Sequence, residues 1–261
     1  MIKKAIILSA GQGKRLLPLT AQRPKCLLPL SGRTLLEWQI AALGANGIRD
    51  VVVVTGFQAQ AVETVIRARA NDDVRVRELH NPFFQVADNI ASCFVARHEM
   101  EDGDFVLLNG DTLFHPDLFA QARAQADASI AVTIDRKERY DSDDMKVRLD
   151  GTRLTAIGKT LPEEQSHAES IGMLFFSGDG GRIFADTLER VIRREDGLKR
   201  WYLSVIDELA AITPIGIADI CGHAWCELDF PKDLPAAEQL ATRLWRQHLG
   251  TDTAALQALA P

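Results

Sequence analysis

The chain of 261 residues is 46% hydrophobic and 25% charged, which are ordinary proportions for a globular protein that can bury a sizeable core. Its formal net charge of −6 at pH 7 excludes the basic excess that a nonspecific nucleic-acid binder pairs with phosphates, so we expect no nucleic-acid partner. No stretch approaches the roughly 20 apolar residues of a membrane helix, and the apolar run at residues 5–8 is too short for a signal peptide, so we expect a cytoplasmic protein without a membrane partner.

Strand and helix patterns alternate through the first half of the chain. The β-branched apolar runs at residues 6–9 and 51–55 predict strands that are buried on both faces. In chain order, the predicted elements are strand 6–9, helix 35–43, strand 51–55, helix 59–70, strand 74–79, helix 89–100, strand 105–109 and helix 116–125. This alternation favours an α/β fold with a mixed, mostly parallel, doubly wound sheet of the Rossmann-like type.

The pattern changes at about residue 128, where shorter strands begin. The predicted elements are strands 129–134, 146–149, 153–157 and 170–176, helices 181–194 and 201–212, at least one strand within 217–228, and a C-terminal helix from 231 to about 249. Asp150-Gly151 is a hairpin signal between two of these strands, so we expect a small antiparallel subregion.

We expect one domain at residues 1–230, divided into halves at 1–127 and 128–230. A C-terminal helix follows at 231–261, and its last dozen residues are expected to fray. Leu240, Leu244 and Leu249 lie on or near one stripe of this helix, which could cap the monomer or build a homodimer.

The first strand runs into a glycine-rich turn within residues 8–20, and Arg23-Pro24-Lys25 follows closely. Glycines let the backbone approach phosphate oxygens, and turn amides point at the anion. Arg15 and Lys25, ten residues apart, can neutralise the charge that builds up when a phosphoanhydride breaks. The turn matches neither the Walker loop nor the three-glycine dinucleotide fingerprint. It predicts a nucleoside triphosphate site, and the alternative is an ordinary strand–loop–helix junction with solvated basic residues.

The whole pattern from residue 10 to residue 25, AGxGxRLxPLTxxxPK, resembles the signature of the nucleotidyltransferase superfamily. Its members make nucleotide-activated sugars and alcohols, and they include sugar-1-phosphate nucleotidyltransferases and phosphocholine cytidylyltransferases. The nucleotide-binding residues of this segment that the resemblance implies are Leu8, Ala10, Gly11, Gly13, Arg15 and Lys25. Of these, Arg15 is expected to hold the β- and γ-phosphates, and Lys25 to neutralise the α-phosphoryl group.

Two strand ends offer carboxylates for a metal ion. Ligands in open α/β sheets bind beyond the carboxyl ends of the strands, and Asp111 follows the apolar strand 105–109. Glu227 and Asp229 share one face of an extended segment by the period of two. Mg²⁺ usually takes one or two carboxylates beside phosphate oxygens, so Asp111 and Asp229 are the predicted Mg²⁺ ligands. The alternatives are a turn-forming role for Asp111 and a helix cap for Asp229.

The segment Asn89-Ile90-x-Ser92 is closer to the phosphocholine and phosphonate cytidylyltransferases than to the sugar enzymes. Asn89 and Ser92 supply polar groups that could contact cytosine or ribose, so both are predicted nucleotide-binding residues beside Asp111. The alternative for Ser92 is a helix-facing hydroxyl without a role in binding.

The resemblance implies a nucleotidyltransferase domain at residues 1–230, with nucleotide binding in the half at 1–127 and acceptor binding in the antiparallel half at 128–230. Lys159 lies where sugar enzymes carry Glu-Lys-Pro, but the flanking glutamate and proline are absent, which disfavours a sugar phosphate. The predicted acceptor-binding residues are Lys146, Lys159, Glu169, Gly172, Trp201 and Glu227. An aromatic and acidic wall that attracts a cationic head by cation–π and charge interactions could be formed by Trp201-Tyr202, Trp225 and Glu227. The alternatives are solvated lysines and a Trp201 that only packs in the core.

The resemblance implies transfer of a nucleotidyl group, preferably from CTP, to a small phosphate or phosphonate such as phosphocholine or 2-aminoethylphosphonate. The first alternative is a sugar-1-phosphate uridylyl-, thymidylyl- or guanylyltransferase. The second is a non-catalytic nucleotide- or sugar-binding regulatory module, which the retention of Arg15, Lys25 and the aspartates disfavours. A guanylyltransferase of the molybdenum-cofactor type is disfavoured by the motif that continues to Lys25.

Overall fold

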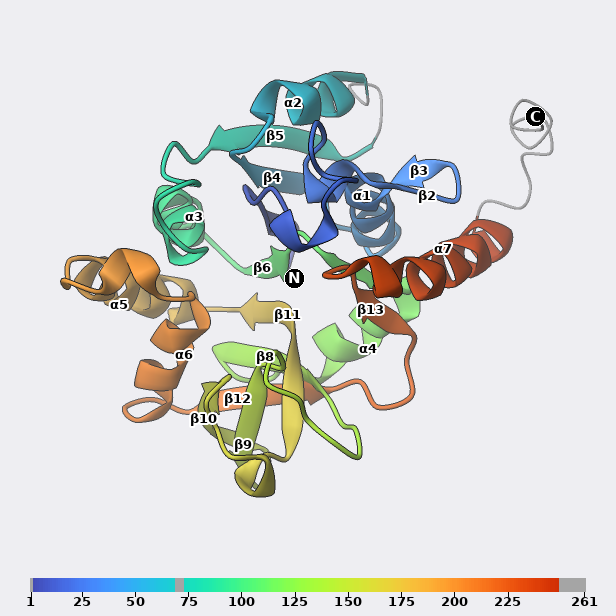
Figure 1. Cartoon of the computed structure of the whole chain (residues 1–261). Helices are drawn as coiled ribbons and strands as arrows, with labels where there is room; N and C mark the ends of the chain where they lie inside the picture. Colours follow the sequence, from blue (N-terminus) through green and yellow to red (C-terminus); the bar gives the residue numbers. More distant parts are fainter. Residues whose placement is uncertain (1, 69–72, 249–261) are drawn as a thin grey trace.

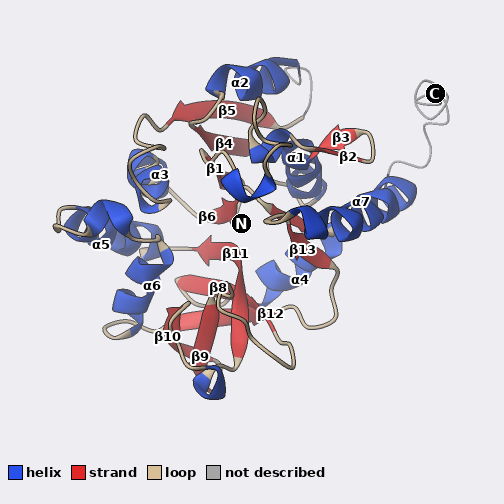
Figure 2. Ribbon diagram, viewed as in Figure 1, coloured by secondary structure: helices blue, strands red, loops and turns tan. Residues whose placement is uncertain are grey.

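The computed structural model describes residues 2–68 and 73–248. In this part of the chain, nine strands form one mixed sheet with the order β5-β4-β1-β6-β11-β8-β12-β10-β9 (Figure 1). These strands are β1 (Lys4–Ser9), β4 (Asp50–Thr55), β5 (Arg75–His80), β6 (Phe105–Asn109), β8 (Ile130–Asp135), β9 (Lys146–Asp150), β10 (Arg153–Gly158), β11 (Ala168–Phe176) and β12 (Ile215–Asp219). The predicted α/β class is confirmed, with helices and one sheet in a layered arrangement (Figure 2).

The sheet is less parallel than the sequence predicts. Strands β5, β4, β1 and β6 pair in parallel, as the alternation in the first half indicates. β11 then pairs antiparallel to both β6 and β8, and β10 pairs antiparallel to β9 and β12. β12 and β8 pair in parallel, so the second half of the sheet is itself mixed. The predicted mixed sheet is observed, and its mostly parallel character is not confirmed.

Two hydrophobic layers cover the two faces of this sheet. The helices are α1 (Leu35–Ala45), α2 (Ala59–Ala68), α3 (Ile90–Val95), α4 (Pro116–Gln125), α5 (Gly180–Ile192), α6 (Leu203–Ala210) and α7 (Leu234–His248). α3, α5 and α6 pack with one set of strand side chains, and α1, α2 and α4 pack with the alternate set. In β1, for example, Ile6 faces the first layer and Ile7 the second, because neighbouring strand residues point to opposite faces. Within the described ranges, no helix combines the length and the apolar character needed to cross a membrane.

The predicted elements are found with shifted ends in several places. The helix expected at 89–100 is divided into α3 and a short 3₁₀ helix, Arg97–Met100. The segment 217–228 contributes the end of β12 and also β13 (Trp225–Glu227), which pairs with β7 (Thr112–Phe114) outside the main sheet. The hairpin signal at Asp150-Gly151 is confirmed, since β9 and β10 pair directly across it.

The C-terminal helix α7 covers its own chain near the glycine turn. Leu240 and Leu244 are buried in a cluster with Leu16 and Leu28, which flank the segments that carry Arg15 and Lys25. The Glu238 carboxylate accepts hydrogen bonds from the backbone amide and the hydroxyl of Ser31, in the turn between β2 (Pro29–Leu30) and β3 (Arg33–Thr34). Of the two roles expected for the leucine stripe, capping the monomer is therefore observed for Leu240 and Leu244. Leu249 and the expected frayed end lie outside the described residues.

Candidate active site

The glycine turn and Asp111 meet because β1 and β6 are parallel neighbours. Leu8 of β1 pairs with Asn109 of β6, so both strands end at the same edge of the sheet. The amide of Gly110 donates to the carbonyl of Leu8 at 3.0 Å, and a Cβ on Gly110 would lie 2.5 Å from the same oxygen. A side chain at residue 110 would therefore separate Asp111 from the end of β1.

The pairing of β7 with β13 brings the second pair of carboxylates to the same edge. Thr112 pairs with Glu227, and the amide of Leu228 donates to the carbonyl of Asp111 at 3.1 Å. Leu228 is fully buried in the cluster beneath α7, which leaves Glu227 and Asp229 on the opposite face. The predicted convergence of Asp111, Glu227 and Asp229 is therefore found in the structure.

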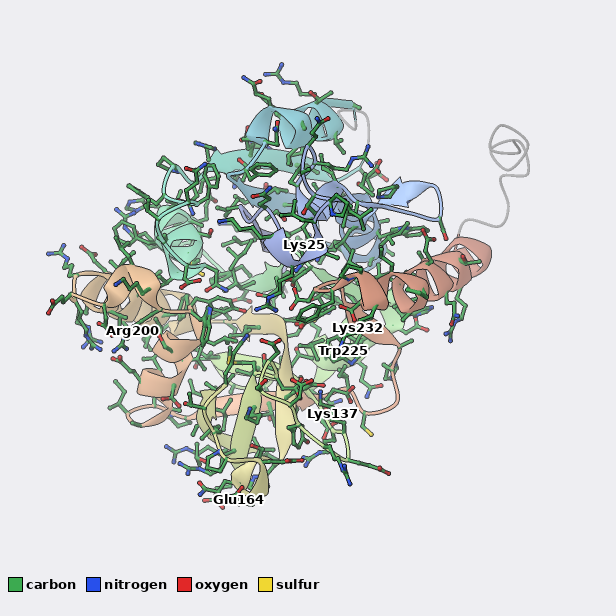
Figure 3. The ribbon with its side chains drawn as sticks, viewed as in Figure 1. Lys25, Lys137, Glu164, Arg200, Trp225 and Lys232 are labelled. Carbon is green, nitrogen blue, oxygen red and sulfur yellow. The ribbon has the colours of Figure 1, made fainter. Side chains whose placement is uncertain are left out.

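Lys25 joins the two aspartates at the centre of the molecule (Figure 3). Its Nζ lies 2.7 Å from Oδ2 of Asp111 and also forms an ion pair with Oδ1 of Asp229. Burial opposes the charged amine, but these two carboxylates raise the pKa of Lys25 above its ordinary value. Gly13 has a φ of 74°, and a Cβ there would lie 2.9 Å from Cβ of Lys25, so the glycine makes room for the lysine stem.

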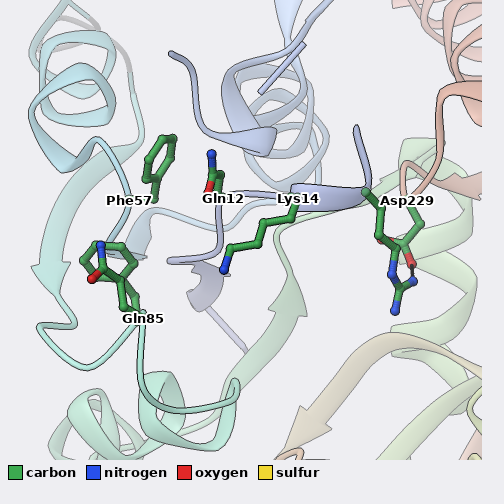
Figure 4. A pocket seen from close by; sticks show the side chains of 8 residues that line it. Gln12, Lys14, Phe57, Gln85 and Asp229 are labelled. Atoms are coloured by element: carbon green, nitrogen blue, oxygen red, sulfur yellow. Dashed lines mark hydrogen bonds and ion pairs between the residues drawn. The ribbon is translucent and has the colours of Figure 1, made fainter. Parts of the chain in front are cut away.

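Arg15 extends from the other end of the glycine turn into a cavity of about 550 Å³. Its Nη1 lies 3.4 Å from Asp229 and its Nη2 lies 3.6 Å from Asp143, while the guanidinium lies 5.1 Å from the centre of the Phe230 ring. Phe57 and Gln85 lie on the side of this cavity opposite Asp229 (Figure 4). Nearly half of the Arg15 side chain is exposed, so the guanidinium can reach a ligand in this cavity.

A smaller cavity lies between the glycine turn and the end of β6. Its lining residues are Leu8, Ser9, Gly11, Gly13, Lys25, Cys26, Asn89, Asn109, Gly110 and Asp111. Six predicted nucleotide-binding residues are therefore brought together. The predicted Ala10 lies beneath them, and its carbonyl accepts a hydrogen bond from the amide of Phe57 that ties the glycine turn to the turn after β4.

A third cavity, of about 140 Å³, adjoins the second through Asn89, Asn109 and Asp111. The predicted acceptor residues Lys159, Glu169, Trp201 and Glu227 all line it. The other lining residues are Asp143, Asp144, Met145, Ser170, Tyr202, Leu203 and Asp229. The residues predicted to bind the acceptor therefore lie next to the ion-paired group formed by Lys25, Asp111 and Asp229.

The carboxylate of Glu227 is the most strongly perturbed acid in this cavity. Burial raises its pKa well above the usual range, and the nearby carboxylates of Asp111 and Asp229 raise it further. Burial also raises the pKa of Glu169, to about 7, although the neighbouring Lys137 amine opposes that shift. Glu227 and Glu169 are therefore harder to ionise than free carboxylic acids, whereas Asp229 has a lowered pKa because the Lys25 amine outweighs the effect of burial.

Besides Ala10, three predicted site residues line none of the three cavities described above. Ser92 is buried, and its Oγ accepts a hydrogen bond from Nδ2 of Asn81 at 3.0 Å. Lys146 is also buried, and its Nζ donates to the carbonyl of Asp141 at 2.8 Å. Gly172 lies behind Asn109, at an irregularity where β11 passes β8. The structure gives these residues supporting positions in place of the expected substrate contacts.

We expect Gly172→Ala to lower the free energy of unfolding by about 1–3 kcal/mol, because the backbone there has a φ of 71° and a Cβ would lie 2.2 Å from Nδ2 of Asn109. Urea unfolding followed by circular dichroism measures the loss. Gly158→Ala is the matched control, since a Cβ at residue 158 meets no atom within 4 Å. Equal unfolding midpoints for the two variants would contradict the packing argument.

Asn109 and Tyr202 form a polar contact that the sequence analysis did not assign. The Tyr202 hydroxyl donates to Oδ1 of Asn109 at 3.1 Å, and the Tyr202 amide donates to Oδ1 of Asn89 at 2.9 Å. Asn109 could have been found by its period of two with Asp111, which places both on one face of the strand end. Tyr202 was expected only as part of an aromatic wall, and its hydrogen bond to Asn109 had no signal in the sequence.

The carboxylates suit a hard divalent cation. Oδ1 of Asp111 is buried and has no hydrogen-bond partner among the described residues, and Asp229 faces the same Lys25 amine. No group of three or more His, Cys, Asp or Glu side chains within residues 2–68 and 73–248 is arranged to hold a metal. A pair of aspartates fits Mg²⁺, which takes its other ligands from phosphates and water.

Comparisons with known proteins agree with this geometry. A profile of the Nucleotidyl transferase family matches residues 4–144. The chain is 31% identical over 247 residues to the CMP-5'-(3-aminopropyl)phosphonate synthase of Streptomyces rubellomurinus, which covers 90% of this chain and 38% of that protein. It is 23% identical over 252 residues to the CTP:phosphoglutamine cytidylyltransferase of Campylobacter jejuni, covering 88% of this chain and 97% of that enzyme.

The fold also matches a solved structure, the inositol-1-phosphate CTP transferase from T. maritima. The TM-score is 0.79 at 21% sequence identity, covering 94% of this chain and 97% of that one. Some of the curated relatives are longer than this chain. The chain spans 38% of the Streptomyces synthase and 52% of the bifunctional IPC transferase and DIPP synthase of Aquifex aeolicus.

Proposed function

The chain belongs to the Nucleotidyl transferase family, and from this premise we propose that it transfers a cytidylyl group from CTP to a small phosphate or phosphonate acceptor. The observation that carries the proposal is the Lys25 amine between Asp111 and Asp229, at the junction of the cavities. It places a cation and two metal-binding carboxylates where a triphosphate and an acceptor would meet.

In the proposed reaction, an acceptor oxygen attacks the α-phosphorus in line. A new P–O bond forms, the bond between the α- and β-phosphates breaks, and pyrophosphate leaves with the electron pair of that bond. Lys25 neutralises charge on the α-phosphoryl group, and Arg15 holds the leaving phosphates from the larger cavity. No covalent enzyme intermediate is needed, so this chain acts by positioning the two substrates and stabilising charge.

Asp111 and Asp229 are the residues that would hold Mg²⁺, which when bound neutralises charge on the phosphate oxygens.

The residues before about 128 would form a Rossmann-like nucleotide-binding half, and those from 128 to 230 an acceptor-binding half. The division is supported by the cavity linings, since the cavity at the glycine turn draws on residues 8–111. Most of the residues that line the acceptor cavity come from 143–229.

CTP is proposed as the donor on two grounds. Asn89, from the segment that resembles cytidylyltransferases, lines both cavities beside Lys25 and Asp111. Two of the relatives named above, which match 90% and 88% of this chain, carry CMP or CTP in their names. A phosphonate or amine-bearing acceptor is supported by the same names and by the acidic lining of the small cavity.

Pyrophosphate release tests this proposal directly. We would cross CTP, UTP, dTTP and GTP with phosphocholine, 2-aminoethylphosphonate, inositol-1-phosphate and glucose-1-phosphate in the presence of Mg²⁺. The expected result is turnover of CTP with a small phospho-alcohol or phosphonate, at least about tenfold above other nucleotides, and loss of turnover on adding EDTA. Turnover confined to glucose-1-phosphate with UTP or dTTP would replace this function with that of a sugar-1-phosphate nucleotidyltransferase.

A further inference from the structure

Two asparagines and an aspartate form the wall that two of the cavities share. Asn89, Asn109 and Asp111 line both the cavity at the glycine turn and the smaller acceptor cavity. Lys25 lines the first of these cavities and contacts Asp111, so this shared wall lies beside the proposed position of the α-phosphate. A phosphoryl group that passes from the nucleotide to the acceptor would move along it.

The side-chain oxygen of Asn89 is held by the second half of the chain. The backbone amide of Tyr202 donates to Oδ1 of Asn89 at 2.9 Å. A backbone N–H can only donate, so this bond fixes which end of the Asn89 amide carries the oxygen. Nδ2 has no hydrogen-bond partner among the described residues, and it is not one of the buried atoms there that lack a partner. The two N–H donors of Asn89 are therefore open to a ligand.

The backbone amide of Tyr202 is itself fixed. The Tyr202 ring is fully buried in the layer that contains α3, α5 and α6, and its hydroxyl donates to Oδ1 of Asn109 at 3.1 Å. Next to Asn89, the amide of Asp88 donates to the carbonyl of Leu198 at 2.8 Å. The segment 198–202 therefore sets the direction in which the Asn89 donors point.

Asn109 has a different arrangement in the same wall. Its Oδ1 accepts from Tyr202, and its backbone carbonyl accepts from Nε2 of Gln39 at 2.8 Å. Its Nδ2 lies against Gly172, where a Cβ would come within 2.2 Å of it. Asn89 is thus the asparagine that turns its N–H groups away from the protein contacts of the wall.

A group that presents only donors does not select cytosine. At position 4 cytosine carries an amine, which donates, whereas uracil carries a carbonyl, which accepts. Oδ1 of Asn89 faces Tyr202, so the end of the amide that is open to a ligand has no acceptor for the cytosine amine. Phosphate oxygens accept hydrogen bonds, and their charge makes each bond that they receive stronger. The exposed end of Asn89 therefore suits a phosphoryl oxygen.

We propose that Nδ2 of Asn89 donates a hydrogen bond to a nonbridging oxygen of the α-phosphoryl group, beside the Lys25 amine. The proposal rests on the function proposed above, and it replaces the expected contact of Asn89 with cytosine or ribose. Asn89 exchanges no proton in the reaction. It orients the phosphoryl group for attack and stabilises the charge on its oxygens.

Calorimetry tests the contact without turnover. In the presence of Mg²⁺, we would titrate the α,β-methylene analogues of CTP, UTP and 2′,3′-dideoxy-CTP, which cannot release pyrophosphate, into the unmodified protein and into Asn89→Ala. The variant is expected to bind each analogue about tenfold more weakly, as the loss of one hydrogen bond to a charged group predicts. The ratios among the three affinities are expected to stay within about twofold, because all three analogues share the α-phosphoryl group.

Two further variants support the comparison. Asn89→Asp keeps an oxygen for the Tyr202 amide and removes the N–H donors, so it is expected to lose affinity for all three analogues as well. It decides the question if Asn89→Ala does not fold. Gln60→Ala is the matched control and is expected to bind like the unmodified protein, because Gln60 is exposed on α2 and lines none of the three cavities. Urea unfolding shows whether each variant is folded.

The outcomes separate a phosphoryl contact from the other contacts. Unchanged affinities in a folded Asn89 variant would overturn the proposal. A change of about fivefold or more in the ratio of the CTP to the UTP analogue would assign Asn89 to the base. Weaker binding of the CTP and UTP analogues, with unchanged binding of the dideoxy analogue, would assign it to a ribose hydroxyl. Either assignment overturns the proposal, as would an equal loss in Gln60→Ala.

The same measurements distinguish this proposal from the proposed function. If no nucleotide releases pyrophosphate with any acceptor, the proposed function fails, while an equal loss of affinity for the three analogues would still support the phosphoryl contact. If CTP is consumed and the Asn89 variants bind all three analogues normally, the function stands and the contact fails. Failure of the unmodified protein to bind any of the analogues would overturn both.

Discussion

Lys25→Ala is expected to lower kcat by about 10²- to 10³-fold while changing the KM for CTP far less. The Lys25 amine lies between Asp111 and Asp229, inside the cavity expected to hold the α-phosphate. Negative charge on that phosphate is redistributed as the anhydride bond breaks, so a fixed cation there stabilises the transition state more than the bound nucleotide. Arg15 lies in the larger cavity and remains to bind the leaving phosphates.

Steady-state pyrophosphate release gives kcat and KM separately, and urea unfolding shows whether the variant remains folded. The stability measurement is needed because Lys25→Ala leaves two carboxylates without their shared amine. Lys3→Ala is the control, since Lys3 is exposed and precedes β1, at the strand end opposite the glycine turn. A folded Lys25→Ala variant with normal kcat would show that Lys25 takes no part in the chemical step. If only the KM for CTP is raised, Lys25 serves in binding the nucleotide.

The parallel half of the fold was predictable because its signals are local. Apolar β-branched runs alternate with amphipathic segments, and the pairings of β1 with β4 and of β4 with β5 join strands that follow each other along this alternation. The position of β11 was not predictable in the same way. Its buried residues mark a central strand, but nothing in that run specifies antiparallel pairing with β6, some 60 residues earlier. The order of strands in a sheet depends on packing between residues that are far apart in the sequence. The hydrophobic periodicity of a single strand does not specify which strands it pairs with.

The charged centre of the site was also predictable, because each of its members follows a recognisable strand end or turn. Lys25, Asp111 and Asp229 were all assigned from such positions, and the structure places them in contact. Ser92 and Lys146 show the limit of this reasoning. A buried polar side chain needs a hydrogen-bond partner, and the sequence does not say whether that partner is a ligand or a nearby protein group. Here both partners belong to the protein.

Several lining residues carried no signal of their own. Asp143 and Asp144 lie in a polar loop, where acidic residues are ordinary, and only the folded structure brings them to the acceptor cavity. Gly172 was predicted to contact the acceptor. It does lie near the acceptor cavity, but there its missing Cβ makes room for the Asn109 side chain. Sequence patterns therefore located the site, while side-chain direction decided which residues face it.

Asp111→Asn is expected to lower kcat by about 10³-fold or more, since it removes a carboxylate that would hold Mg²⁺ at the phosphates. The same change is expected to leave the free energy of unfolding unchanged or to raise it by about 0.5–1 kcal/mol. Asp111 and Asp229 share one buried amine, Glu227 lies beside them, and the charge of Asp111 helps to raise the pKa of Glu227. Asparagine keeps an oxygen for the Lys25 amine and removes one of three repelling charges.

The opposite signs of these two effects distinguish a functional carboxylate from a structural one. If Asp111 served mainly to stabilise the turn after β6, the asparagine variant would lose activity and stability together. Urea midpoints and pyrophosphate release on the same preparations separate the cases, with Asp117→Asn as the control on an exposed position of α4. A variant less stable than the unmodified protein by more than about 1 kcal/mol would contradict the argument from charge repulsion. Unchanged kcat would show that Asp111 does not serve the reaction, because an amide oxygen cannot replace the charge of a carboxylate that holds Mg²⁺.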